Sequence, residues 1–257
     1  MSAWEQWVAF LTIVTREVRR FLRIWPQTLL PPAITISLYF VIFGNMIGSR
    51  VGEMGGFDYM AYIVPGLIMM SVIQNSYGNV VSSFFSTKWQ NSIEEMLVSP
   101  TPSYVILTGF VCGGMVRGIL TGLIVTGLSL FFTELRMEYA WITVLVVVMT
   151  SLLFALGGFL NALFARKFDD IAIVPTFVLT PLTYLGGVFY SIDLLPDFWR
   201  ALSMANPILY MVNTFRFGVL GVSDVNVVVS LCAIVGFVVG LYLLALWLLH
   251  RGTGIRQ

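Results

Sequence analysis

The most informative segment of this sequence is Thr87-Lys-Trp-Gln-Asn-Ser-Ile-Glu-Glu-Met-Leu-Val-Ser-Pro-Thr-Pro102, a polar stretch between two long apolar segments. Asn91 or Ser92 is suited to cap a helix, and Glu94 and Glu95 fall in its first turn, where carboxylates are favourable. The two prolines end it. We therefore predict a helix of about two turns, aligned with the membrane interface, by which a protein outside the membrane could move the flanking segments. The alternative is an ordinary loop helix that only reverses the chain.

The composition around this segment is that of an integral membrane protein. Of the 257 residues, 58% are hydrophobic and 11% are charged, and the mean hydropathy is +0.90, values that soluble domains of this size do not reach. A net charge of +1 without a long basic run excludes nucleic-acid binding as the main function. Cys112 and Cys232 lie deep in apolar stretches, which indicates packing and not a disulfide framework.

Apolar segments of bilayer-crossing length recur along the chain. A crossing helix needs about 20 residues, and the pattern predicts a single transmembrane domain over residues 1–257 with an all-α, polytopic fold. The predicted spans are 27–48, 62–85, 104–132, 141–165, 171–190 and 225–249. The pair Pro31-Pro32 should bend or restart the first span. Six spans place both termini on the same face of the membrane.

The first residues, 4–25, have the pattern of an amphipathic helix. Their apolar side chains recur at helical spacing, and most of the polar ones fill the opposite side. The apolar set is Trp4, Trp7, Val8, Leu11, Val14, Val18, Phe21, Leu22 and Trp25, and the basic set is Arg16, Arg19, Arg20 and Arg23. Such a helix lies in the lipid headgroup layer with its arginines towards the phosphates. The alternative is a helix packed on a soluble partner.

The distribution of Lys and Arg predicts the orientation. The side with the termini carries nine of them: Arg16, Arg19, Arg20, Arg23, Lys88, Arg166, Lys167, Arg251 and Arg256. The other side carries four, which are Arg50, Arg136, Arg200 and Arg216. By the positive-inside rule, the termini and the 87–102 segment are cytoplasmic.

Residues 192–219, before the last span, are too charged for a full crossing but keep two apolar runs. Two short helices broken at Asn206-Pro207, dipping into the outer leaflet without crossing it, would satisfy both facts. A seventh crossing over 207–220 is the alternative, but that segment is short and contains Asn213 and Arg216. We predict a re-entrant helical hairpin.

The sequence contains few groups that could perform chemistry. Lys88 and Lys167 are the only lysines and neither follows a glycine, so no P-loop for ATP is present. The single histidine, His250, allows neither a zinc site with two histidines nor a serine–histidine pair within the membrane. We therefore predict no catalytic residues, no metal site and no cofactor bound by this chain.

Polar residues inside two spans are the candidates for a substrate path. Arg117 lies within span three, where a charge should face a partner or a polar cavity; it could line a route for an anionic headgroup or hold a helix contact. Span two carries a partly polar series that could form a wall touched by an amphiphile or a helix-packing seam. Its members are Gln74, Asn75, Ser76, Tyr77, Asn79, Ser82 and Ser83.

No span has a carboxylate at its centre, which argues against an ion-coupled carrier. The loop Arg166-Lys-Phe-Asp-Asp170 is the second cytoplasmic loop, and its charges could pair with a partner subunit. Alternatively, Asp169 or Asp170 simply caps span five.

The arrangement as a whole resembles the type-2 ABC exporter permeases, whose fold is also called the type V ABC transporter fold. Three strings carry the resemblance in addition to the 87–102 segment and the broken hairpin: Val64-Pro-Gly-Leu-Ile-Met-Met70, Phe215-Arg-Phe-Gly218, and Phe168-Asp-Asp-Ile-Ala-Ile-Val-Pro-Thr-Phe-Val-Leu-Thr-Pro-Leu-Thr-Tyr-Leu-Gly-Gly-Val-Phe-Tyr190. The resemblance covers essentially the whole chain. Its motifs are specific for the family and poorly informative about cargo.

The resemblance implies a homodimer of this permease, multi-pass in the bacterial inner membrane, bound to two separate ABC-type ATPase subunits that hold ATP and Mg. The 87–102 segment would be the coupling helix, with a smaller contact from the 166–170 loop, and 4–25 and 192–219 would match the interfacial helix and outer hairpin of the family. The implied coupling residues are Lys88, Ile93, Glu94, Glu95, Met96, Leu97, Arg166, Asp169 and Asp170.

The expected function is export of a hydrophobic or amphipathic molecule such as a lipid, a glycolipid or a drug-like compound. Polysaccharide export is a less favoured cargo, because a sugar polymer would need a continuous aromatic and polar lining. An ATP-independent carrier and a non-transporting scaffold are the remaining alternatives.

Overall fold

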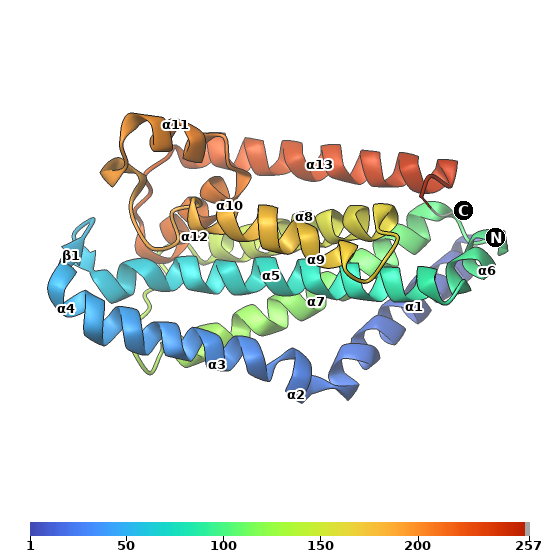
Figure 1. Cartoon of the computed structure of the whole chain (residues 1–257), viewed down its shortest axis with the longest axis horizontal. Coiled ribbons are helices and arrows are strands. Elements are labelled where there is room, and N and C mark those ends of the chain that lie inside the picture. Colours follow the sequence, from blue (N-terminus) through green and yellow to red (C-terminus); the bar gives the residue numbers. More distant parts are fainter. Residues whose placement is uncertain (255–257) are drawn as a thin grey trace.

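The computed structural model describes residues 1–254, apart from the side chains of Asn45 and Leu97. Arg256, counted above among the cytoplasmic basic residues, lies outside this part. The chain forms an elongated helical bundle whose long helices run side by side, with both termini and α6 (Ser92–Val98) at one end (Figure 1). We call this the terminal end of the bundle.

Within the described residues, four helical stretches are long and apolar enough to cross a membrane. They are Trp25–Val51, α7 (Ser103–Ser129), α8 (Ala140–Phe164) and α13 (Val227–Arg251). Helix α5 (Tyr59–Trp89) is longer, with 31 residues, but more polar. The fifth predicted span is helical only over Asp170–Tyr184.

The first predicted span consists of α2 (Trp25–Thr28), α3 (Leu30–Tyr39), the π-helical η1 (Phe40–Ile47) and α4 (Gly48–Val51). The helix restarts at Pro31 and Pro32, in the first turn of α3, as predicted. A proline at this position costs little because the backbone N–H it lacks would have no partner inside the helix.

The loop after the first span contains a small ribbon that the all-α prediction did not include. Strands β1 (Glu53–Met54) and β2 (Phe57–Asp58) pair antiparallel. Gly55 and Gly56 connect them with φ of +61° and +81°, angles that a two-residue hairpin turn requires and that glycine adopts readily.

Helix α5 forms the centre of the bundle, with α7 and α8 packed along it. Glycines permit this close approach: a Cβ at Gly118 of α7 would collide with the Ser76 side chain, and one at Gly158 of α8 would lie 2.5 Å from the Tyr77 carbonyl oxygen. Small residues let helix backbones approach closely where lipid provides no hydrophobic driving force between helices.

Helix α1 (Ala3–Arg23) begins with a capping box formed by Ser2 and Glu5 and crosses the terminal end of the bundle against α7. Its Ile13 and Glu17 side chains sit over Gly109 and Gly113; a Cβ on Gly113 would lie 2.5 Å from the Cβ of Glu17. The predicted 4–25 amphipathic helix is present, and its inner face is seated in a glycine-lined surface of α7.

The fifth predicted span contains α9 (Asp170–Val174), the π-helical η2 (Pro175–Leu179) and α10 (Thr180–Tyr184). The helix ends at Tyr184 instead of the predicted Tyr190, which corrects that boundary. Gly187, with a φ of +70°, adopts the left-handed conformation that ends helices.

The break predicted at Asn206-Pro207 is present at the opposite end of the bundle. It separates α11 (Asp197–Met204), which follows the short 3₁₀ turn η3 (Ile192–Leu194), from α12 (Pro207–Leu220). Asn206 caps α12 by accepting a hydrogen bond from the Ile208 amide at 3.0 Å. Helix α12 is largely buried between α5, α8 and α13.

Candidate functional site

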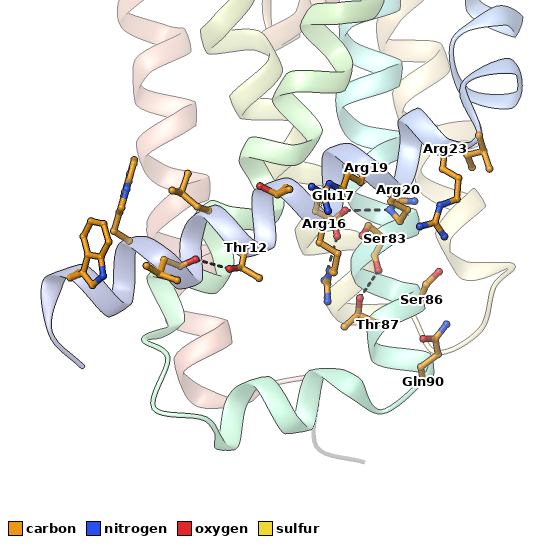
Figure 2. A pocket seen from close by; sticks show the side chains of 16 residues that line it. Thr12, Arg16, Glu17, Arg19, Arg20, Arg23, Ser83, Ser86, Thr87 and Gln90 are labelled. Carbon is orange, nitrogen blue, oxygen red and sulfur yellow. Dashed lines mark hydrogen bonds and ion pairs between the residues drawn. The ribbon is translucent and has the colours of Figure 1, made fainter.

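Helix α6 lies crosswise beyond the end of α5, on the terminal end of the bundle (Figure 2). The chain turns into it through Asn91, the only described non-glycine residue with a positive φ, at +58°. Asn91 holds the N-cap position but its side chain makes no capping hydrogen bond, so the predicted side-chain cap is wrong. The helix ends at Val98, before Pro100, and the Ser99 hydroxyl donates to the Met96 carbonyl at 2.6 Å.

The two sides of α6 differ in chemistry. Ile93 is buried against the bundle, and Met96 packs partly on the core. Glu94 and Glu95 are exposed on the other side, and Val98 is 88% exposed. Leu97 belongs to the helix, but its side chain is outside the described part. Ile93 and Met96 thus attach α6 to the bundle, and Glu94 and Glu95 form an acidic surface at the end of the molecule.

Lys88 connects the end of α5 to the end of α8. Its Nζ donates to the carbonyl oxygens of Leu163, at 2.8 Å, and Ala165, at 2.7 Å. These are carbonyls that the helix end leaves without backbone partners. Burial, and secondarily the nearby Arg166, lower the pKa of Lys88, whereas Asp170 opposes the shift.

The loop after α8 is folded onto the same region. Phe168 packs edge-on against Phe85 and Trp89, with ring centroids 4.9 and 5.4 Å away. The Asp170 carboxylate accepts hydrogen bonds from the backbone amides of Arg166 at 2.8 Å and Lys167 at 3.0 Å. These bonds lower the pKa of Asp170. The Asp170 carboxylate therefore holds the two ends of the 166–170 loop together.

Asp169 occupies the N-cap position of α9, again without a side-chain bond, and is exposed with Arg166. The structure therefore brings the two predicted coupling segments to the same end of the bundle, where Trp89 of one packs against Phe168 of the other. They form one surface on which a partner could act.

Polar contacts beside α1 connect four helices, α1, α2, α5 and α7. The guanidinium of Arg117 on α7 donates to the Asn75 side chain and to the Thr28 carbonyl, both at 3.3 Å. One turn along α5, Asn79 accepts from Arg20 of α1 through its side-chain oxygen at 2.8 Å and its backbone carbonyl at 3.1 Å. Arg117–Asn75 and Arg20–Asn79 are thus two hydrogen-bonded pairs one turn apart on α5.

The other predicted path residues lie elsewhere. Tyr77 faces the glycines of α8 on another side of α5. Gln74 is exposed beside a hollow of about 260 Å³ between α3 and α5, which Tyr39, Ser71 and Asn75 also line. The polar series along the second predicted span therefore divides into two hydrogen-bonded contacts with arginines, a packing seam and an accessible hollow.

Two interior charges were not identified from the sequence. Glu17 is 1% exposed and pairs with Arg16 at 3.3 Å and Arg20 at 3.4 Å. The arginines one residue before Glu17 and three residues after it could have indicated these ion pairs in the sequence. Arg216, counted above among the basic residues of the outer side, is fully buried in α12, and no local pattern in the sequence indicates this burial.

Arg216 is held by a cluster at the opposite end of the bundle. Its guanidinium lies 4.0 Å from the centre of the Tyr62 ring and donates to the Tyr62 and Gly187 carbonyls at 3.3 and 2.7 Å. The Tyr62 hydroxyl donates to Asp224, 3.3 Å away, which also accepts from the Ile192 amide at 3.1 Å. The cluster ties α5 and α12 to the loops around them.

Comparison with known proteins adds family information to this geometry. A family model described as ABC-2 type transporter matches residues 8–220. The inner membrane transport permease YadH of Escherichia coli K12 is 57% identical over 252 residues, which are 98% of each chain. Nodulation protein J of Rhizobium leguminosarum bv. viciae is 24% identical over 219 residues, 83% of each chain.

Proposed function

The chain belongs to the ABC-2 type transporter family, and on this premise we propose that it exports a hydrophobic or amphipathic molecule when driven by ATP. Lipids, glycolipids and drug-like compounds are the substrate classes that fit, leaving from the cytoplasm or the inner leaflet. The chain is a transport permease, a membrane subunit that is not itself an enzyme, and its family implies an ABC-type ATPase partner. ATP and Mg belong on that partner.

The observation that carries the proposal is α6. An exposed acidic helix held by buried Ile93 is a rigid lever, and Lys88 links its base to the end of α8. A partner that pushed on Glu94 and Glu95 would therefore move several helices together. Rigid-body motion of packed elements is a common way to convert binding energy into a conformational change.

The complete transporter would contain two copies of this chain and two ATPase subunits, because alternating access requires two halves that move against each other. The ATPases would bind at the terminal end of the bundle, around α6 and the 166–170 loop. The excess of Lys and Arg at this end supports a cytoplasmic location, with six crossings completed by α5 and Asp170–Tyr184 and the 192–219 hairpin in the outer leaflet. The name of YadH supports the bacterial inner membrane.

Arg117 and Asn75 are the best-supported polar groups near the substrate route, since the hollow between α3 and α5 reaches Asn75. This hollow is small and combines apolar side chains, among them Ile36 and Met70, with the polar Gln74 and Asn75, a mixture that favours an amphiphile over a polysaccharide. An ATP-independent carrier has less support, because no carboxylate lies at the centre of a predicted span.

The proposal is tested by purifying the tagged chain from its native host in mild detergent. We expect a stoichiometric P-loop subunit to come with it, and vanadate to inhibit ATP hydrolysis by the complex. Isolation of the chain alone and inactive, under every solubilisation condition tried, would favour the carrier or scaffold alternative.

Replacing Arg117 with leucine should reduce substrate-stimulated ATP hydrolysis about tenfold, the equivalent of roughly 1.4 kcal/mol in the transport step, while the complex still assembles. The reason is that the guanidinium would no longer be available to an anionic headgroup. Stimulation is measured on the purified complex with a panel of lipids, and Arg136→Leu, at an exposed arginine, is the control. Loss of the assembled complex in the Arg117 variant would instead assign Arg117 to helix packing.

A further inference from the structure

A wide groove lies between α1 and the adjoining end of α5, with a volume of about 1010 Å³ (Figure 2). We call it the α1–α5 groove and define it by Trp4, Trp7, Arg16, Arg19, Arg23 and Ser86. We infer that this groove binds the phosphate headgroup of an anionic phospholipid from the adjacent leaflet. This inference does not depend on transport or on the ATPase partner.

The charge of the groove favours an anion. Four arginines line it, against the single carboxylate of Glu17, and that carboxylate is buried between Arg16 and Arg20. Arg19 and Arg23 are exposed and have no hydrogen-bond or ion-pair partner among the described residues. Guanidinium groups match phosphate oxygens in a two-point geometry, so these two side chains are the free ligands for a phosphate.

The rim of the groove favours a lipid over a free anion. Trp4 is 73% exposed and Trp7 is 52% exposed, and Leu11 beside them is 42% exposed. Indole rings of this kind prefer the level of the lipid headgroups. The apolar side chains line the groove along the N-terminal half of α1 and the arginines line it along the C-terminal half, so an acyl chain could follow the former while its phosphate contacts the latter.

Helix α1, which carries the arginines, is held in one orientation before any ligand arrives. Glu17 is seated against Gly113 of α7, and Arg20 binds Asn79 of α5, so α1 cannot rotate about its axis without breaking both contacts. A prepositioned site loses less conformational entropy on binding than a mobile one. The buried contacts of Glu17 and Arg20 thus hold α1 in the orientation in which Arg19 and Arg23 line the groove.

The test is native mass spectrometry of the purified full chain with phosphatidylglycerol and phosphatidylcholine of the same acyl chains. We expect the wild-type chain to retain phosphatidylglycerol preferentially. The variant Arg19→Gln/Arg23→Gln should lose about 30-fold in affinity for it, because each basic side chain near an anionic lipid contributes roughly a fivefold factor. The control variant Arg50→Gln/Arg136→Gln changes the net charge equally at two exposed arginines of the opposite end and should bind as the wild type does.

Equal retention of the two lipids, or an unchanged preference in the Arg19/Arg23 variant, would overturn the inference. So would displacement of phosphatidylglycerol by inorganic phosphate at the same concentration, which would indicate a free-phosphate site. A variant that keeps its lipid preference but no longer co-purifies with the ATPase would identify the groove as a protein-docking surface instead. Both changed side chains are exposed, so an unaltered thermal midpoint verifies that each variant is folded.

Discussion

Replacing both Glu94 and Glu95 with lysine is expected to detach the ATPase partner while the permease itself stays folded. Both carboxylates are exposed on α6, away from buried Ile93, so their replacement leaves the packing of the helix unchanged. The substitution reverses the charge that a complementary docking groove would face, and like charges across an interface cost several kcal/mol. We expect affinity to fall at least about a hundredfold, roughly 3 kcal/mol.

The measurement is co-purification of the ATPase with the tagged permease, followed by vanadate-sensitive ATP hydrolysis. The matched control reverses two exposed acidic residues at the opposite end, Glu53→Lys and Glu134→Lys. The control should retain the partner in full. If the Glu94/Glu95 variant also retained it at wild-type stoichiometry, α6 would not be the coupling helix.

Replacing Arg216 with leucine should strongly destabilise the end of the bundle opposite the termini. The change removes the donors to the Tyr62 and Gly187 carbonyls and the cation from the Tyr62 ring. Loss of one member of a buried charged network typically costs about 3–5 kcal/mol, because its former partners stay buried without compensation. We expect the unfolding free energy to fall by an amount of this order.

Thermal unfolding of the purified chain in detergent measures this effect. The control is Arg200→Leu, which breaks the exposed Arg200–Asp193 ion pair at 2.9 Å on the same end. Exposed pairs contribute about 0–1 kcal/mol, so this control should unfold near the wild-type temperature. Equal midpoints for the two variants would mean that the buried arginine contributes no more to stability than a surface one.

The membrane character, the α6 helix and most helix positions could be predicted from the sequence because they depend on local patterns. The length of an apolar segment predicts a membrane span. The prolines at 31 and 32 predict that the helix restarts there, and Asn206-Pro207 predicts the helix break before α12. Each of these features is determined by residues that are near one another in the chain.

Boundaries that depend on backbone conformation were predicted less well. The helix of the fifth predicted span ends at Tyr184, shortly before Gly187 takes a positive φ, and the β1–β2 ribbon turns through Gly55 and Gly56, whose φ values are also positive. Glycine permits these angles without requiring them, so composition alone could not fix them.

The interior charges and the division of the polar series along α5 were decided by the tertiary structure. Helix α5 is buried on nearly every side, so its periodicity cannot indicate that Asn75 and Asn79 face α1 and α7 while Tyr77 faces α8. The burial of Glu17 depends on Gly113, and Lys88 finds its carbonyls on α8. These partners are far away in the sequence, and only the packing of helices across glycine contacts brings them together.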